Sequence, residues 1–338
     1  MLSMTRRTFG LLATTAMLAG ATGAASAEPV QVGILSLTSH SPSIIAEGRG
    51  YFEEAGLEVE FVSFQAAQPM AVAIASGDVD FGLTAMTAGL VSLAERGAVK
   101  VIGGALQETP EIEGQKILVS KKAHEAGVTT PADLEGKRFG ITTAGSSFHY
   151  MANKIADKEG FERDAMQLVP LNSVPAVIAS LKSGQIDAWS IVPNIAQGLV
   201  ASGEVFEIGE VADYIDGYQV TTLFTSTEIA ENDPELAESF LAAFSKGVAD
   251  YNAAFVDKTM SEEETAEIVA LVHEYVYTDR PLEEAGPRIR AGAMRINENA
   301  ALNIGSIEDQ LEWFKSEGLV PAEVSMETLV DTSFVETF

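Results

Sequence analysis

Short runs of β-branched and apolar residues alternate with longer stretches of helical periodicity between residues 30 and 225. Each run is about 4–8 residues long, which is the length of an ordinary strand. Parallel strands need a helix-sized connection between them, so repeated strand–helix units predict mostly parallel sheets with helices on both faces. From residue 233 onward only helical periodicity remains. The pattern therefore predicts an α/β protein with a helical C-terminal part.

The bounds of the elements follow from apolar periodicity and from the residues that begin and end helices. The predicted strands are Val30–Leu35, Leu57–Phe64, Asp80–Thr84, Val99–Ala105, Ile117–Ser120, Arg138–Thr142, Met166–Pro170, Ala188–Val192 and Gln219–Thr225. The predicted helices are Ser43–Ala55, Pro69–Ser76, Ala88–Arg96, Thr130–Leu134, Ser147–Lys158, Val174–Ser183, Asn194–Ala201, Pro234–Asn252, Glu262–Tyr275, Pro281–Asn299 and Ser306–Lys315. We expect Ile117–Ser120 and Gln219–Thr225 to carry the chain from one sheet to the other and back.

The N-terminus has the features of an export signal. Arg6 and Arg7 precede an uncharged apolar stretch, Leu11–Ala21, and Ala25-Ser26-Ala27 supplies a small-x-small cleavage pattern. Paired arginines ahead of the apolar stretch are typical of twin-arginine export. A membrane anchor is the alternative, but the stretch is shorter than the roughly 20 residues that span a bilayer. The sequence predicts a signal peptide over residues 1–27, cleavage after Ala27 and a periplasmic mature protein.

The length of the mature chain favours two lobes. Single hydrophobic cores stop growing at about 250–300 residues, and 311 residues follow Ala27. We expect lobe one to combine residues 28–116 with 222–338, and lobe two to span residues 117–221. Two crossing strands would join the lobes as a hinge, and hinge closure around a ligand is one way in which such proteins work.

The composition excludes several classes of protein. The chain contains no cysteine, which rules out disulfides, thiolate metal sites, a cysteine nucleophile and the lipid-bearing cysteine of a lipoprotein. Without residues 1–27 it holds 19 Lys and Arg against 49 Asp and Glu, a formal net charge of −30. Such a charge repels nucleic acid and anionic lipid. It indicates either solubility alone or, more specifically, a cationic ligand. No stretch after residue 27 approaches 18 consecutive apolar residues, so we expect no direct membrane insertion.

Four motifs occur in order along the chain. They are Gly48-x-Gly50-Tyr51-Phe52-x-x-x-Gly56-Leu57, Ala75-Ser76-Gly77-Asp78-Val79-Asp80-Phe81-Gly82, Leu134-Glu135-Gly136-Lys137-Arg138 and Ser183-Gly184-Gln185-Ile186-Asp187-Ala188. In this order they resemble the type II periplasmic solute-binding proteins of ABC transporters, in the branch that serves sulfonates, taurine, nitrate and thiamine precursors. The resemblance covers most of residues 30–225. It implies a two-lobe α/β fold, each lobe a mostly parallel sheet flanked by helices, joined by two hinge strands.

The resemblance also implies a role and partners. Such a protein captures a small-molecule ligand and delivers it to the membrane permease of an ABC importer, without a cofactor or a metal. We expect a monomer that binds no nucleic acid. A ligand-sensing partner of a membrane receptor would use the same pocket, and that alternative stays open.

Ligands of open α/β sheets bind beyond the carboxyl ends of the parallel strands. The residues at and beyond the ends of the predicted strands are therefore the candidates for ligand contact. They are Thr38, Ser39, His40, Gln65, Thr84 and Met86 in lobe one, and Ser146, Ser147, His149, Asn172, Trp189 and Asn194 in lobe two.

The segment from Gly145 to Tyr150 is the most informative of these. Gly145 lets the backbone approach a ligand, and Ser146 and Ser147 open a helix whose free amides carry positive potential. That arrangement suits a sulfonate, a carboxylate or a phosphate, whereas an ordinary serine cap is the alternative. The segment resembles the Gly-Ser-x-x-His-Tyr segment of taurine and alkanesulfonate binders, which implies ligand contacts for Ser146, Ser147 and His149.

Two further features keep the ligand class open. Trp189 follows Asp187-Ala188 near one end of a predicted strand, where it would either stack on the ligand or pack in the core. No arginine occurs in the candidate loops, because Arg49 and Arg138 fall inside a predicted helix and strand. A bidentate clamp on an anion is therefore not predicted. A sulfonate is favoured, while an organic carboxylate and a thiamine-precursor pyrimidine remain alternatives.

The motifs of common enzymes are absent. The histidines at 40, 124, 149 and 273 form no metal pattern, and neither Gly-x-Ser-x-Gly nor a Walker loop occurs. Enzymes of the same fold are the alternative class. A desulfinase-like activity would need the missing cysteine, and a pyrimidine-synthase-like activity conflicts with the export signal. The sequence predicts a binding protein without catalytic residues.

Overall fold

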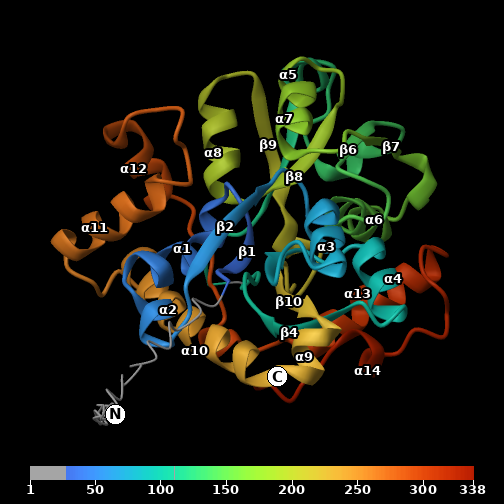
Figure 1. Cartoon of the computed structure of the whole chain (residues 1–338). Helices are drawn as coiled ribbons and strands as arrows, with labels where there is room; N and C mark the ends of the chain where they lie inside the picture. The colour runs from blue at the N-terminus through green and yellow to red at the C-terminus, as the bar shows by residue number, and fades with distance from the viewer. Residues whose placement is uncertain (1–27, 110) are drawn as a thin grey trace, which may run out of the picture.

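Two mixed sheets of five strands form the framework of the protein, one above the other in Figure 1. The computed structural model describes residues 28–109 and 111–338. The predicted signal peptide, residues 1–27, lies outside the described residues. The first lobe is the sheet of order β2-β1-β3-β10-β4 with the helices that cover it, and the second lobe is the sheet of order β7-β6-β8-β5-β9 with its helices. The predicted two-lobe α/β class is confirmed.

Both sheets have the same strand directions. The first sheet contains β1 (Val30–Leu35), β2 (Val59–Phe64), β3 (Phe81–Thr84), β4 (Val99–Gly104) and β10 (Thr222–Ser226). The second contains β5 (Lys116–Ser120), β6 (Arg138–Ile141), β7 (Gln167–Pro170), β8 (Ala188–Ile191) and β9 (Val205–Glu210). In each sheet the fourth strand, β10 or β5, runs antiparallel to both neighbours. The remaining two pairs of each sheet are parallel, so four of the five strands in each sheet run in the same direction, as expected of mostly parallel sheets.

Helices cover both sheets. Those before the first crossing are α1 (Ser41–Gly48), α2 (Tyr51–Glu54), α3 (Ala67–Ser76) and α4 (Ala88–Glu95). The second lobe has α5 (Lys121–Glu125), α6 (Ser147–Glu159), α7 (Val174–Lys182) and α8 (Pro193–Ala201). The C-terminal part adds α9 (Thr227–Asn232), α10 (Pro234–Tyr251), α11 (Glu262–His273), α12 (Leu282–Arg290), α13 (Ile304–Ser316) and α14 (Met326–Leu329). Short 3-10 turns lie at Thr38–His40, Pro131–Leu134, Arg163–Ala165, Val211–Asp213 and Glu298–Ala300, and a π turn at Asn252–Val256.

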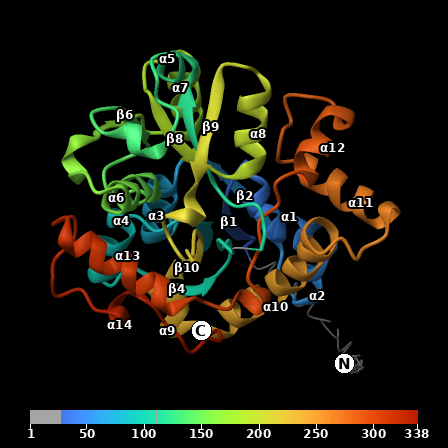
Figure 2. The ribbon, with the colours of Figure 1, turned by 180° about the vertical axis from the view of Figure 1, so that it is seen from behind.

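Alternation along β3 places helices on opposite faces of the first sheet. Phe81 stacks on Phe240 of α10, with ring centroids 4.1 Å apart. The next residue, Gly82, faces Met70 and Ile74 of α3. Successive side chains of a strand point to opposite faces, so α10 and α3 cover the two sides of the sheet. Figure 2 shows α10 and α13 at the base of the molecule and the arm α11–α12 to one side.

The repeated Ser-Gly-x-x-Asp motif does the same work in both lobes. The carboxylate of Asp80 accepts the backbone N–H of Gln31 in β1 at 2.7 Å. The carboxylate of Asp187 accepts the backbone N–H of Arg138 in β6 at 2.9 Å. In the second lobe the guanidinium of Arg138 also donates two hydrogen bonds to the Asp187 carboxylate, at 3.0 and 2.6 Å. The two motifs are therefore similar because each lobe contains the same turn, in which an aspartate accepts a backbone N–H of a neighbouring strand.

Two predicted helices are shorter than expected. The predicted Ser43–Ala55 is two helices, α1 and α2, because Gly50 between them has φ +76°. The predicted Pro281–Asn299 ends at Arg290. Beyond it the backbone pairs with the first crossing segment, since Gln107 N–H donates to the Arg295 carbonyl at 3.1 Å. Periodicity does not reveal such a competing partner for the backbone.

The predicted crossings are also shifted. Ile117–Ser120 and Gln219–Thr225 were expected to carry the chain between the sheets, but β5 and β10 lie within the sheets. Residues 105–115 and 211–221 make the crossings instead, and they pair with each other at Gln107 and Gln219. Strand β9 and helices α5, α9 and α14 were not predicted. The division at residues 116/117 and 221/222 stays a prediction.

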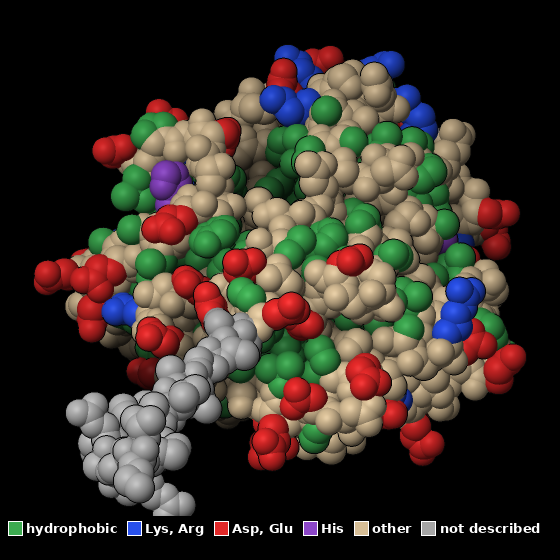
Figure 3. All heavy atoms as spheres, viewed as in Figure 1, with side chains coloured by type: hydrophobic (Ala, Val, Ile, Leu, Met, Phe, Trp, Pro, Cys, Tyr) green, Lys and Arg blue, Asp and Glu red, His purple; other side chains and the backbone are tan. Residues whose placement is uncertain are grey.

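None of the helices that the structure describes is long and apolar enough to cross a membrane. In the space-filling view of Figure 3, acidic side chains are spread over the first lobe, and many of the basic ones lie near α5 and α7 at the tip of the second. The same view shows a hollow with hydrophobic walls between the arm α11–α12 and the second lobe.

We predict that Asp187→Ala lowers the free energy of unfolding by about 2 kcal/mol at neutral pH. Burial of the Asp187 carboxylate opposes its ionisation, but hydrogen bonds from Arg138 outweigh this and hold its pKa below the usual range. A depressed pKa stabilises the fold above the unfolded value of about 3.9, and that contribution is lost as the pH falls through the folded value. Urea unfolding at neutral pH and near pH 3 measures the difference.

The exposed Asp164 serves as the control, and Asp164→Ala should change stability by less than about 0.5 kcal/mol. An Asp187→Ala variant as stable as the parent at neutral pH would contradict the prediction. So would a loss of stability that does not shrink in acid.

Candidate functional site

A cavity lies between the lobes at the carboxyl ends of their parallel strands. It holds about 590 Å³ of space between the atoms, part of it open to solvent. Its walls come from the residues after β1, β2 and β3 in the first lobe, from those after β6, β7 and β8 in the second, and from both crossing segments. The position agrees with the strand-end rule for α/β sheets.

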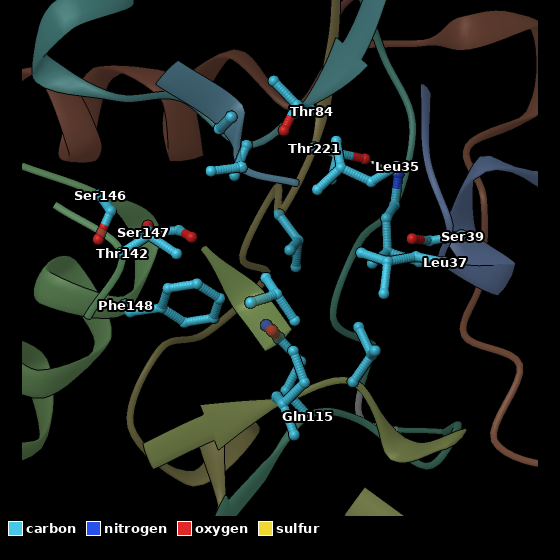
Figure 4. A pocket seen from close by; sticks show the side chains of 18 of the residues that line it. Leu35, Leu37, Ser39, Thr84, Gln115, Thr142, Ser146, Ser147, Phe148 and Thr221 are labelled. Carbon is cyan, nitrogen blue, oxygen red and sulfur yellow. Dashed lines mark hydrogen bonds between the residues drawn. The ribbon is translucent and has the colours of Figure 1, made fainter. Parts of the chain in front are cut away.

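The lining of the cavity is uncharged. Its polar members are Ser39, His40, Thr84, Gln115, Thr142, Ser146, Ser147 and Thr221. Its apolar members are Leu35, Leu37, Ala66, Ala67, Ala85, Leu106, Phe148, Val174, Ile191, Val192 and Val220. Figure 4 shows Thr142, Ser146 and Ser147 on one side and Ser39 on the opposite side. Among the residues around this cavity there is no Asp, Glu, Lys or Arg.

The start of α6 brings the positive end of a helix dipole to the lining. Ser146 is the N-cap of this 13-residue helix, and the first backbone amides of a helix have no partner within it. The Ser146 hydroxyl is buried and has no hydrogen-bond partner among the described residues. An unpaired buried hydroxyl is costly, so a group that accepts or donates at this point would be stabilised.

His40 is a neutral donor. The side chain is 1% exposed, and burial lowers its pKa to about 3. Its Nδ1 accepts the backbone N–H of Leu35 at 3.3 Å. The proton therefore sits on Nε2, because only one nitrogen of a neutral imidazole carries it.

Gln115 brings the first crossing segment into the cavity. Its amide points toward the middle of the space in Figure 4. Its backbone N–H donates to Glu108 Oε1 at 2.9 Å, while its Nε2 has no hydrogen-bond partner within the described residues. Glu108 does not line the cavity and is 1% exposed. Burial raises the pKa of Glu108 to about 7, against the lowering effect of the hydrogen bond from Gln115.

Five of the twelve predicted site residues line the cavity: Ser39, His40, Thr84, Ser146 and Ser147. The other seven lie outside its lining. Two of them bond to each other, since Asn194 Nδ2 donates to Thr38 Oγ1 at 2.8 Å and to the hydroxyl of Tyr277 at 3.0 Å. Ligand contact stays a prediction for all twelve.

The remaining five predicted residues have other surroundings. Met86 is buried in the core, and Gln65 and Asn172 are exposed. His149 turns away from the cavity, because its Nδ1 accepts the Gly145 N–H at 3.1 Å and its ring meets the edge of Trp313. Trp189 is fully buried behind Phe148, with ring centroids 5.3 Å apart.

The lobes touch across the cleft beside the cavity. The backbone N–H of Ala88 donates to the Gly145 carbonyl at 2.9 Å, and that of Val174 to the Gln65 carbonyl at 3.1 Å. Gly145 has φ +71°, and a Cβ at this position would lie 2.5 Å from the Cβ of Ala88. Close approach of the lobes therefore requires glycine here.

Sequence reasoning missed most of the apolar lining. Thr142 and Val192 come directly after β6 and β8, so the strand-end rule had the means to find them. Leu106, Gln115 and Thr221 belong to the crossing segments, where no motif marks a ligand contact. No group of three His, Cys, Asp or Glu side chains suited to a metal ion occurs in residues 28–109 and 111–338.

Two curated relatives are about a quarter identical to this chain over the aligned residues. The taurine-binding periplasmic protein of Escherichia coli K12 is 25% identical over 215 residues, which cover 63% of this chain and 64% of that protein. A putative aliphatic sulfonates-binding protein of Bacillus subtilis 168 is 27% identical over 226 residues, or 65% of this chain and 64% of that protein. The chain thus matches a little under two thirds of the length of these relatives.

Solved structures show the same fold. The alkanesulfonate-binding protein SsuA of Xanthomonas axonopodis pv. citri, bound to MOPS, superposes with a TM-score of 0.70 at 19% identity. The match covers 91% of this chain and all of that structure. The family model described as NMT1/THI5 like matches residues 37–254. The chain therefore belongs to the NMT1/THI5-like family.

Proposed function

We propose that this chain is a periplasmic solute-binding protein that captures a small organic anion, with a sulfonate favoured, and delivers it to the permease of an ABC importer. One observation carries the proposal: a cavity between two lobes in contact, with the unpartnered Ser146 hydroxyl at the start of α6. The taurine- and sulfonate-binding relatives support the ligand class.

Neutral donors suffice for a sulfonate or carboxylate head group. Helix N-termini bind anions through free amides and the helix dipole. At the start of α6 the hydroxyls of Ser146 and Ser147 add two donors beside those amides. His40 Nε2–H adds a third in the same lining. Each such bond contributes about 0.5–1.5 kcal/mol, and a ligand without matching acceptors leaves buried donors unpaired.

The alternatives use the same cavity. A neutral thiamine-precursor pyrimidine would also satisfy hydroxyl and amide donors, and an organic carboxylate differs from a sulfonate only in its head group. An enzyme of the same fold is less well supported. Covalent catalysis needs an activated nucleophile, and the one titratable side chain in the lining, His40, is held neutral by burial.

The same proposal includes export of the chain to the periplasm and a membrane permease as its partner. The features of residues 1–27 support a twin-arginine signal with cleavage after Ala27. A monomer free in the periplasm would present its closed form to the permease. The contacts between the lobes at Gly145 and at Asn194 would form on closure and break on release.

A thermal-shift screen tests the proposal. The panel contains sulfonates, carboxylates, nitrate, amines and pyrimidines. A ligand that binds only the folded protein raises the melting temperature, and we expect the largest rise from sulfonates. A rise from pyrimidines alone would replace the favoured ligand class. Because a retained ligand would mask binding, the screen is repeated after refolding from denaturant; no rise from any class in both screens would contradict the proposal.

We predict that Ser146→Ala with Ser147→Ala weakens sulfonate binding at least about tenfold, because two donors are removed from the head-group end of the cavity. Isothermal titration calorimetry measures the affinity. Ser261→Ala, which removes the serine cap of α11 far from the cavity, is the matched control and should leave affinity unchanged. Unchanged affinity in the double variant would exclude a head-group site at α6.

We also predict that Gly145→Ala weakens ligand binding at least about tenfold, because the added methyl group would overpack against Ala88 and hold the lobes apart. Gly160→Ala is the control. Gly160 has φ +80° but nothing within 4 Å of a Cβ, so this variant imposes the same backbone strain without the clash. Equal affinities of the two variants would show that the contact at Gly145 is not needed for binding.

A further inference from the structure

Most of the cavity lining is apolar, and uncharged polar side chains lie both at the α6 end and elsewhere, at Ser39, His40, Thr84, Gln115 and Thr221. Away from the serines of α6, its walls include Leu35 and Leu37 from the first lobe and Val192 from the second. Leu106 and Val220 come from the two crossing segments. These side chains are buried except for Leu37, which is partly exposed. The part of a ligand that leaves the head-group end therefore meets mostly hydrocarbon, with uncharged polar groups between and no charged side chain.

No carboxylate is available to a positive charge in this cavity. The lining contains no Asp or Glu. The nearest buried acid on the first crossing segment, Glu108, lies behind Gln115 and accepts the Gln115 backbone N–H through Oε1. Beyond it, Glu210 is engaged by Lys116 at 2.5 Å. An ammonium group in the cavity would thus be buried without an ion-pair partner.

The cost of burying a charge without an ion-pair partner distinguishes between ligands of equal size. Transfer of an isolated charge into an apolar environment costs much more than transfer of a neutral polar group, and hydrocarbon gains from the same burial. The net charge of −30 on the mature chain does not offset this cost, because surface charges act through solvent and are screened beyond about 8–10 Å.

Resting on the proposed function, we propose that the ligand is an organic anion with an uncharged, apolar body, an alkyl or aryl sulfonate, and that the site discriminates against aminosulfonates such as taurine. The head group would bind at the start of α6, and the body would lie against Leu35, Val192 and Val220. The specificity comes from the absence of an acid in the lining.

Two probes of nearly equal size test the proposal in the unmodified protein. Butanesulfonate and 3-aminopropanesulfonate have the same number of heavy atoms and differ by a terminal methyl against an ammonium group. We expect butanesulfonate to bind at least about tenfold more tightly in isothermal titration calorimetry. Equal or tighter binding of the aminosulfonate would overturn the inference and leave the proposed function standing. Binding of neither probe, nor of any other sulfonate or carboxylate, would overturn both.

A charge placed in the aliphatic wall supplies a second test. Leu37→Asp should shift the preference toward 3-aminopropanesulfonate by at least about tenfold, because the ammonium gains an ion-pair partner. Leu37→Asn has nearly the same shape without the charge and should not shift it. Leu37 is partly exposed, so both variants are expected to fold, and their melting curves verify this. A shift of equal size in both variants would show that charge is not the discriminating property.

Discussion

The buried amide of Gln219 ties together the segments on which the position of the cavity depends. Its Nε2 donates to the carbonyls of Leu106 at 3.2 Å and Thr221 at 3.0 Å, and its Oε1 accepts from Asn297 Nδ2 at 2.9 Å and from Asn303 N at 3.1 Å. One side chain thus joins both crossing segments to the C-terminal part of the chain. Loss of one partner would leave other buried groups unpaired. The crossing-segment walls of the cavity are held in place by this network.

The charge of the protein and the chemistry of its site are separate matters. Acidic residues outnumber basic ones by 28 over the whole chain, yet none lines the cavity. Recognition in the proposed site would rely on dipoles: helix amides, hydroxyls and a histidine that burial keeps neutral. Fixed dipoles would already point at such a ligand before it binds, so closure would need little reorganisation. A high net charge governs solubility and association, and it does not predict the charge of a pocket.

The sequence predicted the fold better than it predicted the site. The repeated strand–helix pattern and the four motifs indicated the two-lobe class, because they reflect local rules that hold within one unit. The strand-end rule placed Ser39, Thr84 and Ser146 in the lining for the same reason. Gln115 and Leu106 escaped prediction, because their positions depend on how two segments far apart in sequence meet. The error at Pro281–Asn299 has the same origin, since its backbone pairs with residues near 105.

The two lobes have the same strand arrangement but would contribute differently to the proposed site. Asp80 and Asp187 hold the first strand of each parallel group in the same way, so both sheets present their strand ends to the cleft. The lobes differ in the segments that leave those strand ends. After β6 comes Gly145, then two serines and a helix of 13 residues, whereas the helix after β3 begins with Thr87 bonded to Leu90 N–H and Gln68. Because the Thr87 hydroxyl is already paired and the Ser146 hydroxyl has no partner among the described residues, the second lobe is the better candidate for binding the proposed head group. The first lobe would then contribute Ser39, His40, Thr84 and part of the aliphatic wall, which would give two similar halves different parts in one site.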